Sequence, residues 1–421
     1  MSRPVGDALE EALAILRPVM DVLVERPADG LVPAWVSARG WEAALLGLSD
    51  DALHAAERSP ARWLAAHASG SLRELAERAD VFVAGYRFAD GEADADDRTP
   101  RTDADGREPR TDADDREPTT DSETDADAPR AERRPRHVKA RKQAQIDAFV
   151  AAAAELTGVE RVVDLGSGHG HLTRALGGLA AAIGVEREPS RAARARELGG
   201  EFIQGEGARA RLRPGDLAVG LHPCGALGDD LVRSARGAGA RVLMVSCCYQ
   251  KTPPPSRQWL SERAEGFSLS RDALGLANLS PISFPGSGTL GDKRRWRRTR
   301  LALRLALEAR GEVVGPGDEA RGVTKERFAR GLRAAADRAY ERRGLTPASD
   351  AELDQAREAA ARIHGRVARF ALPRHALARV LELAIVLDRA AFLAEGGMDA
   401  RVRPLFDLAT SPRNLAVVAQ P

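Results

Sequence analysis

The spacing of hydrophobic residues divides the chain into helical and strand-like stretches. Residues 1–88 carry apolar positions at helical spacing, as in "DALEEALAILRPVMDVLV", which predicts an N-terminal helical region. Five short apolar runs follow further along the chain, at 161–166, 181–186, 201–205, 216–222 and 241–246. Ala- and Arg-rich helical stretches separate these runs. Strands that alternate with helices in this way predict a parallel sheet with helices on both faces.

The last third of the chain changes pattern twice. Residues 258–395 are mostly helical by periodicity, and two further strand candidates follow at 401–406 and 415–420. Two terminal strands this close together predict an antiparallel hairpin within 396–421 that joins the edge of the sheet formed by 136–257. The helical region is then an insertion on the substrate side of an α/β fold. The alternative is a separate helical domain followed by a loose tail.

A polar segment separates the N-terminal helices from the first strand. Residues 89–135 are rich in Asp, Glu, Arg, Thr and Pro, and "PRTDADGRE" is followed by the near copy "PRTDADDRE". Such a segment has little to bury and cannot offset the entropy of ordering itself. It is predicted to be a disordered linker, and a spacer role is favoured over a binding tail.

Composition restricts the possible partners and compartments. The formal net charge is +1, so a nucleic acid or membrane would have to be met by a local patch. The N-terminus lacks a clean signal-peptide core, and no apolar run reaches membrane-spanning length. Only three cysteines occur, two of them adjacent, which argues against a disulfide framework. These features predict a cytoplasmic protein with no membrane partner.

A glycine-rich turn follows the first predicted strand in "VVDLGSGHGHLTRALGG" (162–178). Its glycines stand at Gly166, Gly168 and Gly170, whereas a dinucleotide fingerprint would place its third glycine at His171. The chain also lacks the G-x-x-x-x-G-K-[ST] loop of nucleoside triphosphatases. Asp164, at the strand end, would repel a pyrophosphate but suits the cationic amino acid moiety of S-adenosylmethionine.

The end of the second predicted strand supplies a further acidic residue. Glu186 lies where a carboxylate can accept hydrogen bonds from both ribose hydroxyls. The arrangement resembles class I S-adenosylmethionine-dependent methyltransferases. That resemblance implies a Rossmann-like seven-stranded sheet ending in a hairpin, and it places Glu206 of "QGEG" near the adenine. The predicted cofactor-binding residues are Asp164, Gly166, Ser167, Gly168, Gly170, Glu186, Glu206 and His222.

Three cysteines, a histidine and a tyrosine follow the fourth and fifth predicted strands. They lie in "GLHPCGALGDDL" (220–231) and "VSCCYQK" (245–251). Because ligands bind outside the carboxyl ends of parallel strands, these side chains should converge beside the methyl donor. The predicted catalytic residues are therefore His222, Cys224, Cys247, Cys248 and Tyr249.

Four roles stay open for this group. The first is a zinc site formed by His222 and the cysteines, which is disfavoured because the C-x-x-C spacing is absent and the adjacent Cys247 and Cys248 are expected to point in different directions. Cys224 could act as a nucleophile toward a base, although no acid partner is evident. The thiols could simply pack in the core. The last role is noncovalent lining of the substrate pocket, with His222 and Tyr249 as its polar groups.

Several motifs together narrow the resemblance. "HVKARKQAQI", "DLGSGHGHLTRAL", "LHPCGAL", "SCCYQK" and "PLFDLATSPRNLAVVA" are similar to the methyltransferase-like protein 25 family, which includes ribosomal RNA adenine dimethylase domain-containing proteins. The likeness extends from about residue 137 to the C-terminus. "LHPCGAL" and "SCCYQK" are also similar to motifs of eukaryotic transfer-RNA 2′-O-methyltransferases, from which Pro223 and Tyr249 depart. No Asn-Pro-Pro-Tyr element follows the fourth strand, which disfavours methylation of the adenine N6.

A basic run with an aromatic residue points to RNA. "GDKRRWRRTR" (291–300) combines cations for phosphate with an aromatic side chain for stacking, although it could equally be the solvated start of an amphipathic helix. The predicted RNA contacts are Lys293, Arg294, Arg295, Trp296, Arg297 and Arg298. We therefore expect a methyltransferase that acts on ribosomal or transfer RNA. The alternatives are a protein or small-molecule methyltransferase, a nicotinamide-linked oxidoreductase and a non-catalytic binding module.

Overall fold

The computed structural model describes residues 3–87, 140–207, 211–279, 289–315 and 317–421. These residues form two compact units. The helical unit is built from the described residues within 1–86, 249–281 and 288–388. The sheet unit is built from those within 87–248 and 389–421. The predicted linker, 89–135, lies outside the described residues.

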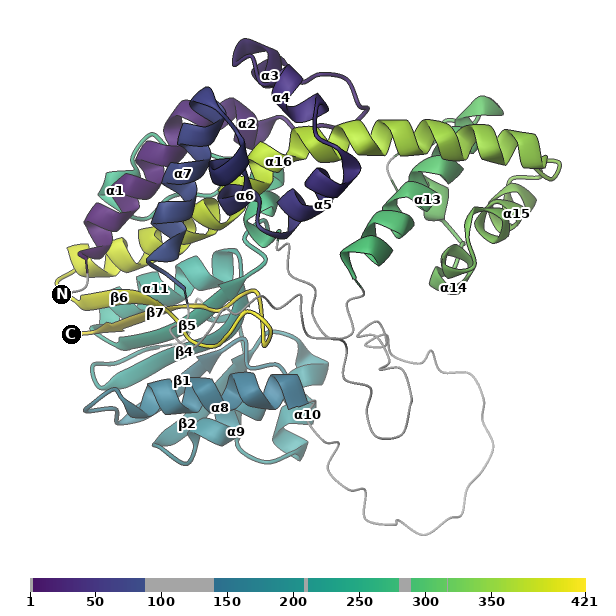
Figure 1. Cartoon of the computed structure of the whole chain (residues 1–421). Coiled ribbons are helices and arrows are strands. Elements are labelled where there is room, and N and C mark those ends of the chain that lie inside the picture. Colours follow the sequence, from purple (N-terminus) through teal and green to yellow (C-terminus); the bar gives the residue numbers. More distant parts are fainter. Residues whose placement is uncertain (1–2, 88–139, 208–210, 280–288, 316) are drawn as a thin grey trace, which may run out of the picture. The chain divides into compact units, whose positions relative to one another are not determined.

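Seven strands form one sheet in the sheet unit (Figure 1). Their bounds are β1 Arg161–Leu165, β2 Ala181–Glu186, β3 Glu201–Gln204, β4 Asp216–Cys224, β5 Arg241–Cys247, β6 Asp399–Pro404 and β7 Leu415–Gln420. The strand order is β3-β2-β1-β4-β5-β7-β6. Strands β1 to β5 pair in parallel, whereas β7 pairs antiparallel with both β5 and β6. This confirms the predicted Rossmann-like class I methyltransferase fold with its terminal hairpin.

The central strands are covered on both faces. Most residues of β1, β4 and β5 are buried, as expected for parallel strands that carry helices on each side. The covering helices are α8 Ala140–Ala154, α9 His171–Leu176, α10 Pro189–Glu197 and α11 Ala226–Ala238. Ile146 and Phe149 of α8 pack in one cluster with Val162 of β1, Leu243 of β5 and Val418 of β7. The core therefore fixes the strand ends at which the candidate site lies.

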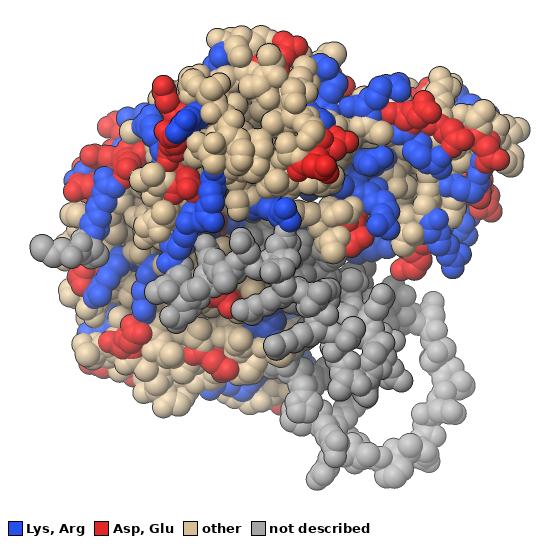
Figure 2. Space-filling view, in the orientation of Figure 1, with Lys and Arg blue, Asp and Glu red and all other residues tan. Residues whose placement is uncertain are grey.

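The helical unit contains the remaining helices. Their bounds are α1 Val5–Leu16, α2 Met20–Val24, α3 Ala34–Ala38, α4 Glu42–Leu46, α5 Asp50–Arg58, α6 Pro60–His67, α7 Gly70–Ala84, α12 Arg271–Leu274, α13 Leu290–Ala309, α14 Lys325–Ala329, α15 Leu332–Arg342 and α16 Asp350–Glu395. The boundary between the units falls within α16, between Asp388 and Arg389. On the face seen in Figure 2, acidic and basic side chains are interspersed over α13 to α16.

The N-terminal helices and the helical insertion belong to the same compact unit. The Arg374 guanidinium of α16 donates to the Val22 carbonyl oxygen at 2.8 Å. Arg263 forms an ion pair with Glu10 of α1. Local periodicity carries no information about these long-range contacts, so the sequence predicted two separate helical regions where the structure has one unit.

No helix in the described part of the chain combines the length and apolar character needed to cross a membrane. This finding does not identify the cellular compartment, so the predicted cytoplasmic location stays a prediction.

Candidate active site

The glycine turn between β1 and α9 depends on backbone conformations that favour glycine. Gly166, Gly168 and Gly170 have φ angles of 80°, 57° and 73°. A Cβ atom on Gly170 would lie 2.1 Å from the Phe202 ring, so a side chain there would displace a buried aromatic. A Cβ atom on Gly168 would meet nothing within 4 Å among the described residues. The turn is thus tight on its inner side and open at Gly168, where a ligand can approach the backbone.

Asp164 is buried at the start of this turn. Its side chain is 2% exposed, and Oδ2 accepts a hydrogen bond of 2.6 Å from the Thr173 hydroxyl of α9. Burial raises the pKa of Asp164 to about 6, and the nearby charge of Glu186 adds to the rise. A buried carboxylate with few donors around it is a site that a cationic ligand group would complement.

We expect the thermal stability of an Asp164→Asn variant, relative to wild type, to rise with pH. The pKa of about 6 in the folded protein lies above the ordinary value of 3.8, so the folded state holds a proton that the unfolded chain has already released. The contribution of Asp164 to stability is therefore present below pH 4 and is lost as pH rises to about 6, by roughly 3 kcal/mol. Melting temperatures of both proteins at pH 4.5 and pH 7.5 test this, and a pH-independent difference would contradict it.

Glu186 lies at the end of β2 and contacts the glycine turn. Its Oε2 accepts from the Gly168 amide at 2.8 Å, and Oε1 accepts from the Glu188 amide at 2.9 Å. The side chain is 7% exposed. Because a carboxylate has about four lone-pair sites, two backbone donors leave room for ribose hydroxyls. The two carboxylates predicted from the sequence thus both lie at the glycine turn, where the charge of Glu186 contributes to the raised pKa of Asp164.

Two further residues from the predicted cofactor-binding set, Ser167 and Glu206, lie at this edge. The hydroxyl of Ser167 is buried and has no hydrogen-bond partner among the described residues. Glu206 is exposed two residues after the end of β3, and the Gly205 amide donates to the Glu186 carbonyl oxygen at 3.0 Å. The structure therefore brings the ends of β1, β2 and β3 together as the sequence predicted, and an unsatisfied donor remains where a ligand would sit.

His222 occupies an irregular point at the end of β4. The pairing of β4 with β5 shifts register between Leu221 and Cys224, and His222 has a φ of 69°. Its Nε2 lies 2.9 Å from the Gln145 side-chain oxygen, and donation to that oxygen would leave Nδ1 as an acceptor. Nδ1 is buried without a partner among the described residues. Burial, followed by the charge of Arg141, lowers the pKa of His222 to about 4, so the ring is neutral at pH 7.

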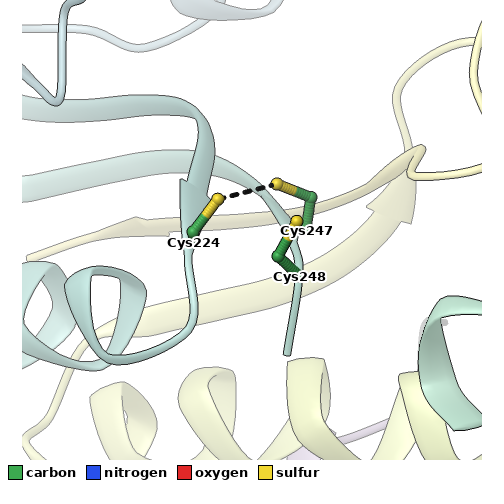
Figure 3. A group of neighbouring side chains, drawn as sticks. All are labelled: Cys224, Cys247 and Cys248. Atoms are coloured by element: carbon green, nitrogen blue, oxygen red, sulfur yellow. Dashed lines mark hydrogen bonds between the residues drawn. The ribbon is translucent and has the colours of Figure 1, made fainter. Parts of the chain in front are cut away.

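The three cysteines lie together at the ends of β4 and β5 (Figure 3). The thiols of Cys224 and Cys247 donate to the His222 carbonyl oxygen at 3.7 and 3.4 Å. The Cys224 and Cys247 sulfur atoms lie 3.4 Å apart, and all three sulfurs lie within 4.8 Å of one another. The expectation that Cys247 and Cys248 point in different directions is wrong for their sulfur atoms. Cys248 has left-handed backbone with a φ of 43°, which departs from the alternation of an extended strand.

Tyr249 takes a different place from the one predicted. It belongs to the helical unit, and its ring is 1% exposed. Its hydroxyl donates to Glu382 of α16 at 3.1 Å, and its backbone amide donates to Asn278 at 3.2 Å. The predicted role as a polar group of the substrate pocket does not fit this environment, because the hydroxyl already has a buried acceptor.

Arg389 is a structural residue of this edge that sequence reasoning missed. Its guanidinium is 1% exposed and donates to Asp229 of α11 at 2.8 Å, to the Ser246 hydroxyl at 2.6 Å and to the Gly225 carbonyl oxygen at 3.1 Å. Gly225 directly follows Cys224 in the sequence, and Ser246 directly precedes Cys247. The one available signal was a charged residue inside the apolar run of α16, where an arginine is rarely buried unless it is paired.

The basic run forms the first half of α13 in the helical unit. Thr289 and Asp292 form a capping box at its start, and the helix continues into buried apolar positions, so the amphipathic-helix interpretation is confirmed. Arg294 is mostly buried and paired with Glu57, while Trp296 stacks under Arg300, whose guanidinium lies 4.6 Å from the ring. Of the six predicted RNA contacts, four are exposed, namely Arg295, Trp296, Arg297 and Arg298.

Comparison with known proteins supports the methyltransferase assignment of the sheet unit. Residues 140–253 match a family model described as a methyltransferase domain. The chain is also 36% identical over 114 residues to protein-L-isoaspartate O-methyltransferase 2 of Anaeromyxobacter sp. (strain Fw109-5). That match covers 27% of this chain and 40% of the relative's own length. Residues 140–253 are therefore similar to methyltransferase domains, over less than half of the relative's length.

Solved structures resemble smaller parts of the chain. A protein of Pyrococcus horikoshii OT3 is 16% identical with a TM-score of 0.23 and covers 25% of this chain and 57% of its own. The YcgJ protein of Bacillus subtilis is 20% identical with a TM-score of 0.22 and covers 25% of this chain and 50% of its own. Similarities at these TM-scores support no functional inference.

Proposed function

We propose that the chain is an S-adenosylmethionine-dependent methyltransferase. The observation that carries the proposal is the buried carboxylate of Asp164 behind three left-handed glycines, with Glu186 at the end of the next strand. Asp164 would pair with the ammonium group of the donor's amino acid moiety, and Glu186 would accept from the ribose hydroxyls. The bound sulfonium supplies an activated methyl group. The protein then has to align the acceptor with that group and exclude water.

His222 would act as a positioning group beside the donor rather than as a strong base. A neutral ring whose Nε2 faces Gln145 can present Nδ1 as a hydrogen-bond acceptor toward the substrate. A pKa of about 4 makes such a ring a weak proton acceptor. A neutral His222 ring suits a methyl acceptor that has to be oriented by a hydrogen bond and does not have to be deprotonated by this histidine.

We propose RNA as the acceptor. Arg295, Arg297 and Arg298 expose guanidinium groups along one short stretch of α13, and Trp296, 41% exposed, lies among them. Guanidinium groups bind phosphates, and an exposed indole offers a stacking surface. The motif likeness to the methyltransferase-like protein 25 family supports the same class of substrate. Arg294, which is paired with Glu57, is not assigned an RNA contact.

The test is transfer of labelled methyl groups from S-adenosylmethionine to total RNA by the full chain. An Arg297→Glu, Arg298→Glu variant is expected to lose at least about tenfold in RNA methylation at 0.15 M salt, because it removes two phosphate contacts. The slope of log binding affinity against log salt concentration should also become less steep by about two. The matched control is Arg62→Glu, Arg73→Glu, which makes the same charge change at exposed positions of α6 and α7. Donor affinity should be unchanged in both.

The similarity to a protein-L-isoaspartate O-methyltransferase favours a second acceptor, a carboxyl group on a protein. The same assay therefore includes an isoaspartyl peptide. Methylation of the peptide that the Arg297→Glu, Arg298→Glu change leaves intact, with no methylation of RNA, would overturn the RNA proposal and keep the methyltransferase proposal. Absence of donor binding by a folded protein would overturn both.

A further inference from the structure

Three sulfur atoms from two neighbouring strand ends form a compact cluster in the sheet unit (Figure 3). Cys224 ends β4, Cys247 ends β5, and the two are direct register partners. Their sulfurs lie 3.4 Å apart, and Cys248 brings a third sulfur within 4.8 Å of both. Among the described residues, no histidine or carboxylate joins this group within the same distance.

The local backbone that builds the cluster is unusual. His222 and Cys248 are the non-glycine residues with positive φ in the described chain. His222 lies in β4 two residues before Cys224, and Cys248 directly follows the end of β5. Residues with a Cβ atom adopt this conformation unfavourably, so the surrounding fold must hold it in place. Ordinary packing of small thiols does not require this, because a cysteine in regular strand conformation fills the same volume. The left-handed backbone therefore indicates that the fold is constrained to hold the sulfur atoms facing one another.

We propose that Cys224, Cys247 and Cys248 bind one zinc ion through three thiolates. A tetrahedral site with zinc–sulfur bonds of about 2.3 Å places its sulfurs about 3.8 Å apart, so the observed cluster needs only small side-chain movements. Each thiol releases one proton as its sulfur coordinates, and the three thiolates around one dication carry a net charge of −1. The fourth position is left to water or another donor atom, as in zinc sites that remain open to exchange.

The surroundings are consistent with this assignment. A bound dication stabilises thiolates directly, so it would favour release of the three thiol protons. Soft thiolate ligands select zinc over magnesium or calcium. The Arg389 contacts with Gly225 and Ser246 fix the two strand ends from which the sulfurs project.

The experiment measures metal content in the tag-free full chain, purified with a non-thiol reductant and without chelator. We expect about one zinc ion per chain by elemental mass spectrometry, and occupancy below about a tenth of that in Cys224→Ser, Cys247→Ser and Cys248→Ser. His67→Ala, which removes an exposed histidine of α6, is the control and should keep full zinc. Protein grown with cobalt should show the thiolate-to-cobalt charge-transfer band and the intense visible bands of a tetrahedral site.

A second measurement on wild-type protein keeps the test independent of variant folding. Because the chain has three cysteines in total, every thiol detected belongs to the cluster. Zinc-loaded protein should react slowly with a thiol reagent, and a chelator should release zinc and expose three fast-reacting thiols. Metal-free protein with fast-reacting thiols, zinc retained by all three variants, or a mass two hydrogens lower that marks a Cys224–Cys247 disulfide would each overturn the proposal. None of these readouts depends on methyl transfer.

Discussion

An Asp164→Asn variant is expected to bind S-adenosylmethionine roughly 30-fold to several thousandfold more weakly than wild type at pH 7.5. The substitution keeps the shape of the side chain and leaves Oδ1 able to accept from Thr173, but it removes the buried charge that would pair with the ligand's ammonium group. Breaking a buried, hydrogen-bonded charge pair costs about 2–5 kcal/mol. Calorimetric titration of both proteins with S-adenosylmethionine and S-adenosylhomocysteine measures the loss.

The pH dependence gives this prediction a second readout. With a pKa of about 6, Asp164 is ionised at pH 7.5 and largely protonated at pH 5, so wild-type affinity should fall as pH falls through 6. The variant should show no such fall. Asp399→Asn makes the same change at an exposed position on β6, an edge strand of the sheet, and should leave affinity intact. Unchanged affinity in Asp164→Asn would remove the charge-pairing role and with it the main support for the donor site.

The sheet and the strand ends that carry Asp164 and Glu186 could be predicted from the sequence because their signals are local. Buried parallel strands read as short apolar runs, and each of the five predicted runs contains an observed strand core. Asp164 and Glu186 could be placed at strand ends for the same reason, since strand ends and glycine turns are visible in a few consecutive residues. Their roles in donor binding stay predictions. Topology then placed both at one edge.

The features that sequence reasoning missed depend on contacts between distant parts of the chain. Arg389 meets Ser246 across 143 positions, and Tyr249 meets Glu382 across 133. Tyr249 directly follows Cys248 in the sequence, yet its hydroxyl donates a hydrogen bond to Glu382 within the helical unit. The direction of the Cys248 sulfur was missed because strand alternation was assumed where the backbone turns left-handed.

An Arg389→Met variant is expected to destabilise the sheet unit by about 3–5 kcal/mol. Methionine fills much of the same space, but it leaves Asp229, 4% exposed, without its guanidinium partner. Removing one partner of a buried ion pair leaves an uncompensated charge, which is why the cost exceeds that of a surface pair. A loss of this size should lower the melting temperature of the sheet unit by about 10 °C in differential scanning calorimetry.

The double variant Arg389→Met, Asp229→Leu separates charge burial from packing. Replacing both partners by apolar side chains removes the uncompensated charge, so most of the lost stability should return. Arg401→Met removes the exposed pair with Asp399 on β6 and should change stability by less than about 0.5 kcal/mol. A double variant as unstable as Arg389→Met would show that the hydrogen bonds to Gly225 and Ser246 carry the stability instead. In that case both variants should also expose Cys224 and Cys247 to thiol reagents, because those bonds hold the two strand ends together.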